Sequence, residues 1–448
     1  MKKMFLFGSL MIVSGILFFS CKKDGHYPKP AEKFPADVAI EWMKLHMQLN
    51  KTTTGFNSVV AGRSFGYAGL TLYESIVPAA RDGRSIASQL TDGNILKDLL
   101  PRADKNYFYS PASANAAMAS ITKALFGNTS PANIKTIDSL EAAFKAKFNS
   151  HADKKELEAS EDFGKKLATA IFDWSKTDGG HEAYLHVTNP SYVVPTGAGL
   201  WIPTPPAFAP IPIHSGWGSN RTFFPGVAAS SQAPAPIPYS EDNNSAYYKG
   251  AKELYDISLS LSREDSTIAR FWADLPVNFN VPAHATGILT QLIVLKGLNL
   301  EAAAIAYAKH GMAMNDALIT VLKAKYTHNT MRPISFIRSV LNHPNWNTVV
   351  PTPPHPEYPA AHGLVSGASA TVLEDIFGKH FAFTDHTYDN LYGARTFKDF
   401  KEYASEAGHS RVLAGIHYKT SVMTGLEYGR KVGEAINSLG FAKESSYK

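Results

Sequence analysis

Residues 300–326 read LEAAAIAYAKHGMAMNDALITVLKAKY and form the longest stretch of helical periodicity in this chain of 448 residues. Apolar side chains recur along it with the 3.6-residue period of a helix, so the stretch predicts one long helix. Convincing alternation of apolar and polar residues, the pattern of a half-buried strand, is absent from the chain. The expected fold class is therefore all-α.

Helical periodicity also covers most of the C-terminal half. The expected helices are 246–261, 263–273, 283–296, 362–377, 397–408 and 415–438. Together with 300–326 they would form a helical bundle over residues 241–448.

The N-terminal half, residues 36–240, begins with a helical stripe around Trp42. The pairs Ser110-Pro111 and Ser130-Pro131 each place a capping residue before a proline at the first helical position. Another helix is expected at 155–175. The expected architecture is two packed helical bundles.

Residues 190–240 join the two halves and differ from them in composition. They hold 11 of the 27 prolines, too many for helices or central strands. Aromatic residues are frequent here, and disordered linkers usually lack them. We therefore expect an ordered proline-rich excursion that packs through Trp201, Phe208, Trp217, Phe223 and Phe224.

The N-terminus reads as an export signal. Residues 1–20 contain two early lysines, a short apolar region and a final serine, and Cys21 follows. A small residue before a cysteine resembles a bacterial lipoprotein signal. We expect lipidation of Cys21 and a tether over 21–35, in an exported lipoprotein that faces the periplasm or is anchored to the outer membrane or cell surface. An ordinary signal peptide with an incidental cysteine is the alternative.

Composition limits the classes of partner. The formal net charge is +5 and contains no long basic runs, so nucleic-acid binding is not indicated. A single cysteine forms neither an intrachain disulfide nor a cysteine-based zinc site. The oligomeric state is left open.

The first of three chemically suggestive segments is KYTHNTMRP, residues 325–333. Lys325 and Arg332 are seven residues apart, which on one helix is about two turns and nearly one face. Two cations on one face repel, so an anion between them would explain the arrangement. Pro333 biases Arg332 out of regular helix. A solvated basic face is the alternative.

The second segment is TPPHPEYPAAHG, residues 352–363, which leads into an apolar helix. His362 would lie on the first turn of that helix. Helix N-termini offer free backbone N–H groups and favour anions such as phosphate or vanadate. His362 could then act as a general acid or base, although a capping or surface role is the alternative.

The third segment is HSRVLAGIHY, residues 409–418. Arg411 offers a bidentate fork for an oxyanion, and His417 follows six residues later. Six residues on an ideal helix is about 240°, so one continuous helix would aim the two side chains apart. Gly415 would relieve this by marking the start of a new helix.

The three segments complement one another. Lys325, Arg332 and Arg411 match a tetrahedral trianion, and His362 and His417 can serve its two apical positions. In-line chemistry at phosphorus requires that set, and vanadate takes the same geometry.

The order Lys-x6-Arg-Pro, Pro-x-x-His, Ser-Arg-x5-His resembles the superfamily of type-2 phosphatidic-acid phosphatases and vanadium-dependent haloperoxidases. The segments 316–338, 352–363 and 410–418 look most like the bacterial haloperoxidase branch, with support from 199–210 and 269–276. The resemblance places the catalytic bundle in the C-terminal half.

The resemblance also implies roles. Lys325, Arg332 and Arg411 would bind equatorial oxygens, with backbone N–H groups at Ala361 and His362 as further donors. His417 would be the axial ligand of vanadate or the nucleophile towards phosphorus. His362 would be the acid–base residue, and Lys325 would polarise bound peroxide.

Two positions depart from the family pattern. The family has Pro-Ser-Gly-His where this chain has Pro359-Ala360-Ala361-His362, so a serine hydroxyl is missing at Ala360. The family also has an aspartate four residues after the axial histidine, where this chain has Ser421.

Three functions follow as expectations. The first is a vanadate-dependent peroxidase that oxidises halide or a similar small nucleophile with hydrogen peroxide. The second is a metal-independent acid phosphatase, without cofactor, that acts on a phosphate ester through a phosphohistidine at His417. The third, which Ala360 and Ser421 favour, is a lipid-anchored phosphate-binding protein with a degenerate site.

Overall fold

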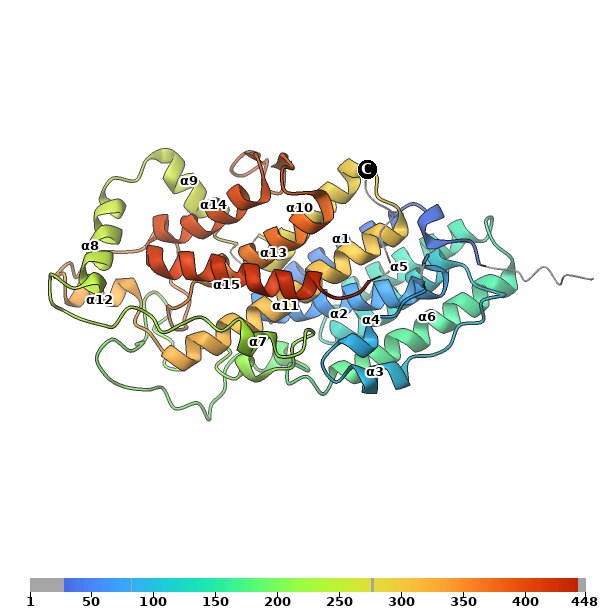
Figure 1. Cartoon of the computed structure of the whole chain (residues 1–448), viewed down its shortest axis with the longest axis horizontal. Helices are drawn as coiled ribbons and strands as arrows, with labels where there is room; N and C mark the ends of the chain where they lie inside the picture. The colour runs from blue at the N-terminus through green and yellow to red at the C-terminus, as the bar shows by residue number, and fades with distance from the viewer. Residues whose placement is uncertain (1–27, 82, 275–277, 442–448) are drawn as a thin grey trace, which may run out of the picture.

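A computed structural model describes residues 28–81, 83–274 and 278–441 (Figure 1). The predicted signal peptide 1–20 and Cys21 lie outside these ranges. The described chain is mostly helical, as predicted. In the N-terminal part the α-helices are α1 (Asp37–Thr52), α2 (Ser58–Ile76), α3 (Gly93–Leu99), α4 (Ser110–Leu125), α5 (Pro131–Phe148), α6 (Lys154–Ser175) and α7 (Val227–Ser230).

The C-terminal part contains eight more α-helices among the described residues. They are α8 (Ala246–Leu259), α9 (Arg263–Phe271), α10 (Val281–Lys296), α11 (Leu300–His328), α12 (Pro333–Ser339), α13 (Ala361–Phe377), α14 (Phe400–Leu413) and α15 (Lys419–Asn437). The helix predicted at 300–326 is α11, within two residues at its end. The periodicity missed the seven-residue α12.

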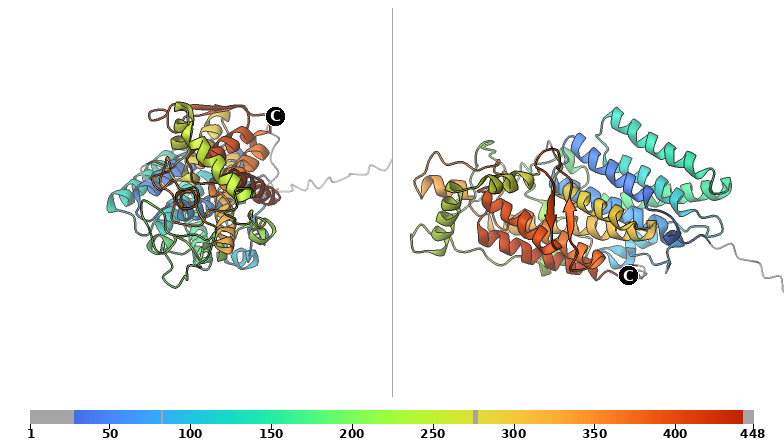
Figure 2. Two further views of the ribbon diagram at one scale, coloured as in Figure 1. Left: turned by 90° about the vertical axis from the view of Figure 1, so that its left-hand side faces the viewer. Right: turned by 90° about the horizontal axis from the view of Figure 1, so that it is seen from above.

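Helix α11 lies at the centre of the molecule. It packs against α2 on the N-terminal side and against α13 on the C-terminal side, and its residues are buried almost without interruption from Leu300 to Leu322. Figures 1 and 2 show α5 and α6 towards one end of the elongated molecule and α8, α9 and α12 towards the other. One contiguous apolar core extends through both halves, so the halves are joined by packing as well as by chain.

Helix α2, which the sequence did not reveal, is the closest partner of α11. Every residue from Val59 to Ile76 is buried, as in α11, but the three glycines of α2 and its β-branched and aromatic residues are weak helix formers. Glycines bring the two backbones together. A Cβ on Gly69 would lie 2.5 Å from the Tyr307 carbonyl oxygen, and one on Gly311 would lie 2.3 Å from that of Phe65.

Two short strands correct the expectation of helices alone. β1 (Phe383–Asp385) pairs antiparallel with β2 (Arg395–Phe397), and Asp385 lies opposite Arg395. Three residues are too few for strand alternation to be visible in a sequence. The hairpin is inserted between α13 and α14, and β1 packs against α10.

The cap predictions are half right. Ser130 caps α5, since its side chain accepts a hydrogen bond from the Asn133 N–H. Helix α4, however, begins at Ser110 itself, with Tyr109 at the capping position.

The proline-rich excursion 190–240 is ordered, and part of it lines the candidate active site described below. Trp201, Trp217 and Phe223 are buried as expected, but Phe208 is exposed. The Trp201 N–H donates to the Asn329 carbonyl oxygen, directly after α11. Residues 31–35, assigned to the tether, instead pack on the body: Ala31 and Phe34 are buried, and the Leu300 N–H donates to the Phe34 carbonyl.

None of the helices in the described ranges has the length and apolar character needed to cross a bilayer.

Candidate active site

The predicted site residues come from five places in the C-terminal bundle. Lys325 lies in the last turn of α11, Arg332 immediately before α12, His362 in the first turn of α13 and Arg411 in the last turn of α14. His417 lies in the connection to α15. A cavity of about 400 Å³ is lined by Ala361, His362, Arg411 and His417, and the other two cations lie behind its wall.

The backbone conformation between α11 and α12 explains where Lys325 and Arg332 lie. Asn329 ends α11 in the left-handed conformation, and Arg332 is extended before Pro333. The bias of Pro333 is confirmed, but the expectation that Lys325 and Arg332 share one helical face is wrong, because Arg332 lies beyond the end of α11.

Gly415 interrupts the helix between Arg411 and His417 as expected, but the new helix predicted to start at Gly415 does not start there. The φ of +80° at Gly415, which glycine adopts without strain, turns the chain after α14. Helix α15 begins only at Lys419, so His417 lies in an irregular link that is free to face back towards Arg332.

Backbone carbonyl groups hold all three cations. Lys325 Nζ donates to the carbonyl oxygens of Pro356 and Glu357 at 2.8 and 2.6 Å. Arg332 donates to the carbonyl oxygens of His355 and Ile416 at 2.8 and 3.0 Å. These contacts leave one of the three ammonium N–H groups of Lys325 for another acceptor.

Arg411 retains unused donor capacity. Its guanidinium donates to the Trp272 carbonyl oxygen and to His362 Nε2, the latter at 3.0 Å. Its Nε is buried and has no hydrogen-bond partner in the described part of the chain. An unsatisfied buried guanidinium N–H is costly, and a bound oxyanion would supply its acceptor.

His417 is held in one tautomer. Arginine can only donate, so Arg332 Nη1, 3.2 Å from Nε2, requires a lone pair on that nitrogen. The proton is then on Nδ1, which donates to Glu357 Oε1 at 2.8 Å. Burial and the adjacent Arg332 and Lys325 hold the pKa of His417 well below its ordinary value, so the ring is neutral.

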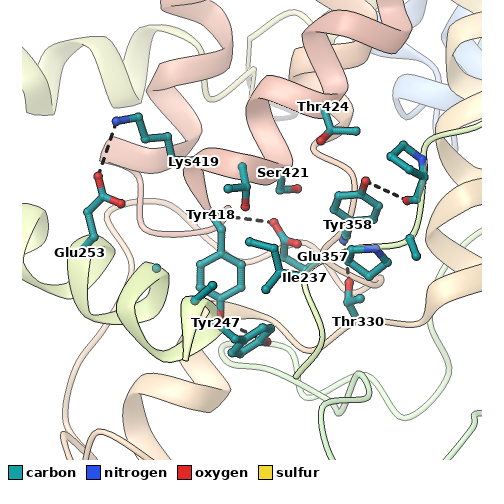
Figure 3. A pocket seen from close by; sticks show the side chains of 16 residues that line it. Ile237, Tyr247, Glu253, Thr330, Glu357, Tyr358, Tyr418, Lys419, Ser421 and Thr424 are labelled. Carbon is teal, nitrogen blue, oxygen red and sulfur yellow. Dashed lines mark hydrogen bonds and ion pairs between the residues drawn. The ribbon is translucent and has the colours of Figure 1, made fainter. Parts of the chain in front are cut away.

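Sequence reasoning did not identify Glu357, the carboxylate that contacts His417. The family pattern places the orienting carboxylate four residues after the histidine, where this chain has Ser421, whereas Glu357 approaches from a separate loop. It lies within the quoted segment 352–363, but only the fold brings it to His417. Glu357 also lines a second cavity of about 160 Å³, beside Tyr247 and Tyr418 (Figure 3).

His362 lies between two opposite charges. Its Nε2 is 3.0 Å from Arg411 Nη1 and 3.6 Å from Asp274 Oδ2. Burial and Arg411 lower its pKa to about 4, while Asp274 opposes the shift. His362 is therefore neutral at neutral pH, with Nε2 accepting from Arg411.

The N-terminus of α13 adds donors beside these side chains. Ala360 is its capping residue and makes no side-chain cap. Its N–H donates to the Ser421 carbonyl oxygen. Ala361 and His362 begin the helix, so their N–H groups have no acceptor within it.

The charges of the site favour an anion. Three buried cations face two buried carboxylates, Glu357 and Asp274, and the Asp274 charge is shared with another histidine, His284. Burial and Arg332 together lower the pKa of Lys325, a direction that a bound anion would oppose. The orphaned Arg411 Nε, the free N–H of Lys325 and the lone pair of His417 together fit vanadate.

Known proteins match both the sequence and the fold. Residues 306–441 match the family described as the VCPO second helical-bundle domain. A crystal structure titled as the first bacterial vanadium-dependent iodoperoxidase is 30% identical, with a TM-score of 0.81, over 92% of this chain and 99% of that one. No match was found among curated protein sequences.

Two further solved structures share the fold. They are holo and apo forms of a bacterial vanadium-dependent chloroperoxidase, each 14% identical over 91% of this chain with a TM-score of 0.62. They cover 93% and 96% of those chains. On the 30% identity across nearly the whole length, this chain belongs to the vanadium-dependent haloperoxidase family.

Proposed function

We propose that the protein is a vanadate-dependent peroxidase that uses hydrogen peroxide to oxidise a halide or a similar small nucleophile. The observation that carries this proposal is the environment of His417 Nε2. Its lone pair faces Arg332, at the wall of a cavity that also contains His362 and Arg411. Vanadate, when bound, would supply an electrophilic centre that activates peroxide.

The chain's cations would hold vanadate through hydrogen bonds to its oxygens. Arg332 would transfer its hydrogen bond from His417 Nε2 to one of those oxygens, which frees that nitrogen to bind vanadate. Arg411 would use its unpartnered Nε, and Lys325 its remaining N–H. Because carbonyl groups already hold the three side chains, little reorganisation is needed on binding.

His362 would move the proton. Its neutral Nε2 can accept a proton from peroxide entering the cavity, and Asp274 Oδ2 at 3.6 Å would then stabilise the charged ring. The same nitrogen would later return that proton to the peroxide oxygen that leaves as water.

The cavity walls suit a small nucleophile. They include the apolar side chains of Val281, Leu318, Leu322, Val365 and Ile416, which exclude water and strengthen the electrostatic interactions. Since the 30% identical structure is titled an iodoperoxidase, iodide is the first halide to test, followed by bromide.

The test is reconstitution of purified protein with orthovanadate, followed by iodide oxidation and bromination of a phenolic dye with hydrogen peroxide. We expect turnover that depends on both vanadate and peroxide and is lost in His417→Ala. A folded protein that binds vanadate and oxidises neither halide would contradict the proposal.

A phosphatase remains the second candidate, because the same cations suit a phosphate ester and Nε2 of His417 is an unprotonated nucleophile. His417 would attack phosphorus, and His362 would protonate the leaving alcohol. An aryl phosphate assay on the same sample tests it, with vanadate as the expected inhibitor. Binding of phosphate without any turnover would favour the degenerate-site alternative.

Cys21 is proposed as a lipid anchor that holds the exported enzyme at a membrane facing the periplasm or the cell surface. The support is the sequence pattern of residues 1–21 alone. Metabolic labelling with an alkyne fatty acid in a bacterial host should label the wild type and not Cys21→Ala. Equal labelling of both would contradict the anchor.

A further inference from the structure

A chain of four buried side chains begins at His362 and leads away from the cavity. His362 Nε2 is 3.6 Å from Asp274 Oδ2, Asp274 Oδ1 is 2.8 Å from His284 Nδ1, and His284 Nε2 is 2.8 Å from Asp385 Oδ2. Imidazole and carboxylate groups alternate along this chain of side chains. The members come from α13, the segment after α9, α10 and β1, so only the tertiary structure assembles the chain.

His284 is a cation on geometric grounds. Each of its ring nitrogens lies at hydrogen-bond distance from a carboxylate oxygen, and two ionised acceptors require an N–H on both nitrogens. Although burial alone would lower its pKa, Asp274 and Asp385 raise it to about 10. In turn, His284 holds the pKa of both carboxylates below their usual range, against the effect of burial.

Surrounding groups leave the chain little freedom to rearrange. The Tyr388 hydroxyl donates to Asp274 Oδ1 at 3.1 Å, and the Trp272 ring stacks on His284 with centroids 4.8 Å apart. The Thr387 N–H and hydroxyl donate to Asp385 Oδ1 at 2.9 and 2.6 Å. Asp274 itself has a φ of +48°, a left-handed conformation that the surrounding contacts stabilise.

The inserted hairpin thus supplies side chains to this buried group. β1 supplies Asp385, and the residues after it supply Thr387 and Tyr388. None of the three lines the cavity. Asp385 and Tyr388 contact His284 or Asp274, and of the latter two only Asp274 lines the cavity, so Asp274 links them to the cavity.

We propose that His284 and Asp385 are positioning residues for the acid–base histidine: they act through Asp274, by holding its carboxylate opposite His362 Nε2 and by sharing its charge. The inference rests on the proposed function, because it takes His362 as the residue that moves the proton.

The proposal follows from the two neighbours of His362 Nε2. The neutral ring accepts from Arg411 at 3.0 Å, and the protonated ring would instead pair with Asp274. An uncompensated Asp274 would favour the protonated ring strongly and slow the return of the proton. The His284 imidazolium limits that preference, so both states of His362 remain accessible.

Among the described residues, the titratable or charged groups that face these four side chains come from several packed elements and include Tyr403 of α14, which lies near both carboxylates. Asp274 faces His284 from the segment after α9, Asp385 and Tyr388 from the hairpin region, and Arg411 of α14 faces both His362 and Asp274. His284→Gln removes one positive charge from this set, and Asp385→Asn removes one negative charge. The two variants should therefore shift the His362 pKa in opposite directions.

The experiment is an NMR titration of the histidine ring protons in the vanadate-free full-length protein. His284→Gln should raise the pKa of His362 by about one unit, and Asp385→Asn should lower it by a smaller amount. His310→Gln is the matched control: His310 is equally buried but pairs with Ser369 and touches neither Asp274 nor His284. It should leave the His362 pKa unchanged.

Unchanged His362 pKa values in folded His284→Gln and Asp385→Asn would overturn the proposal, as would shifts of the same sign. If one variant does not fold, the sign of the shift in the other still decides. The titration needs no turnover, so its failure is distinguishable from failure of the proposed function, which would appear as a vanadate-loaded wild type without peroxidase activity. In an active enzyme, the acid limb of the pH–rate profile should move in the same two directions.

Discussion

His362 and His417, two of the histidines that line the cavity, are held in opposite ways. His417 donates to Glu357 at 2.8 Å and accepts from Arg332 on its other nitrogen, so both ring nitrogens are committed. His362 has a single nitrogen between Arg411 at 3.0 Å and Asp274 at 3.6 Å. The first arrangement suits a fixed neutral ligand, and the second suits a group that exchanges a proton. Their carboxylate partners differ accordingly, because cations flank Glu357 whereas another histidine shares Asp274.

Removing the fixed ligand should have the largest effect. We expect His417→Ala to reduce vanadate-dependent turnover by about 1,000-fold or more and to weaken vanadate binding measured by calorimetry. His386→Ala, an exposed histidine on the hairpin, is the control and should retain activity. Comparable turnover in the two variants would remove His417 from the mechanism.

Because His284 lies buried between Asp274 and Asp385, we expect the stability of the protein to depend on pH. The folded-state pKa of His284 is about 10, above its ordinary value of 6.5. Its contribution to stability is complete below the ordinary pKa and is lost as the pH rises through the folded value. We expect the free energy of unfolding to fall by about 3 kcal/mol between about pH 7 and pH 10, measured by urea denaturation.

The variants separate this contribution from general alkaline destabilisation. His284→Gln should be less stable at pH 7 and should lack the alkaline decline, whereas His310→Gln should retain it. Parallel pH curves for the wild type and His284→Gln would show that His284 is not a stabilising cation.

Glu357 should matter less than His417 itself. Glu357→Gln preserves shape but removes the charge that orients His417, and we expect a loss of about 10- to 100-fold in vanadate affinity. Adding Ser421→Asp, which restores a carboxylate at the position usual in the family, should recover part of the loss. An unaltered affinity in Glu357→Gln would reduce Glu357 to a structural role.

The smallest effect is expected at the N-terminus of α13, which carries His362. Ala360 has the extended backbone of a capping residue but makes no side-chain cap. Ala360→Ser should raise the free energy of unfolding by about 1 kcal/mol. Ala361→Ser, one position into the helix, is the control and should not stabilise. Equal changes in the two variants would exclude capping as the cause.

Local pattern was a reliable guide to part of this molecule. The helices at 246–261, 283–296 and 300–326 were predictable because each has a polar face or a long uninterrupted period. The deeply buried α2 was not, because its glycines and its β-branched and aromatic residues are weak helix formers, whereas the equally buried α11 is rich in alanine and leucine. The five residues Lys325, Arg332, His362, Arg411 and His417 were found because their spacing follows a family motif, but the shared helical face assumed for the first two was wrong.

The sequence by itself determined the helical class, the cations and the two histidines, because these depend on short-range periodicity and on motifs a few residues long. Only the tertiary structure decided which carboxylate serves which histidine. Glu357 is 60 residues from His417, and Asp385 is 101 residues from His284. No local period connects such pairs, and their geometry depends on how α10, α13 and the hairpin pack together.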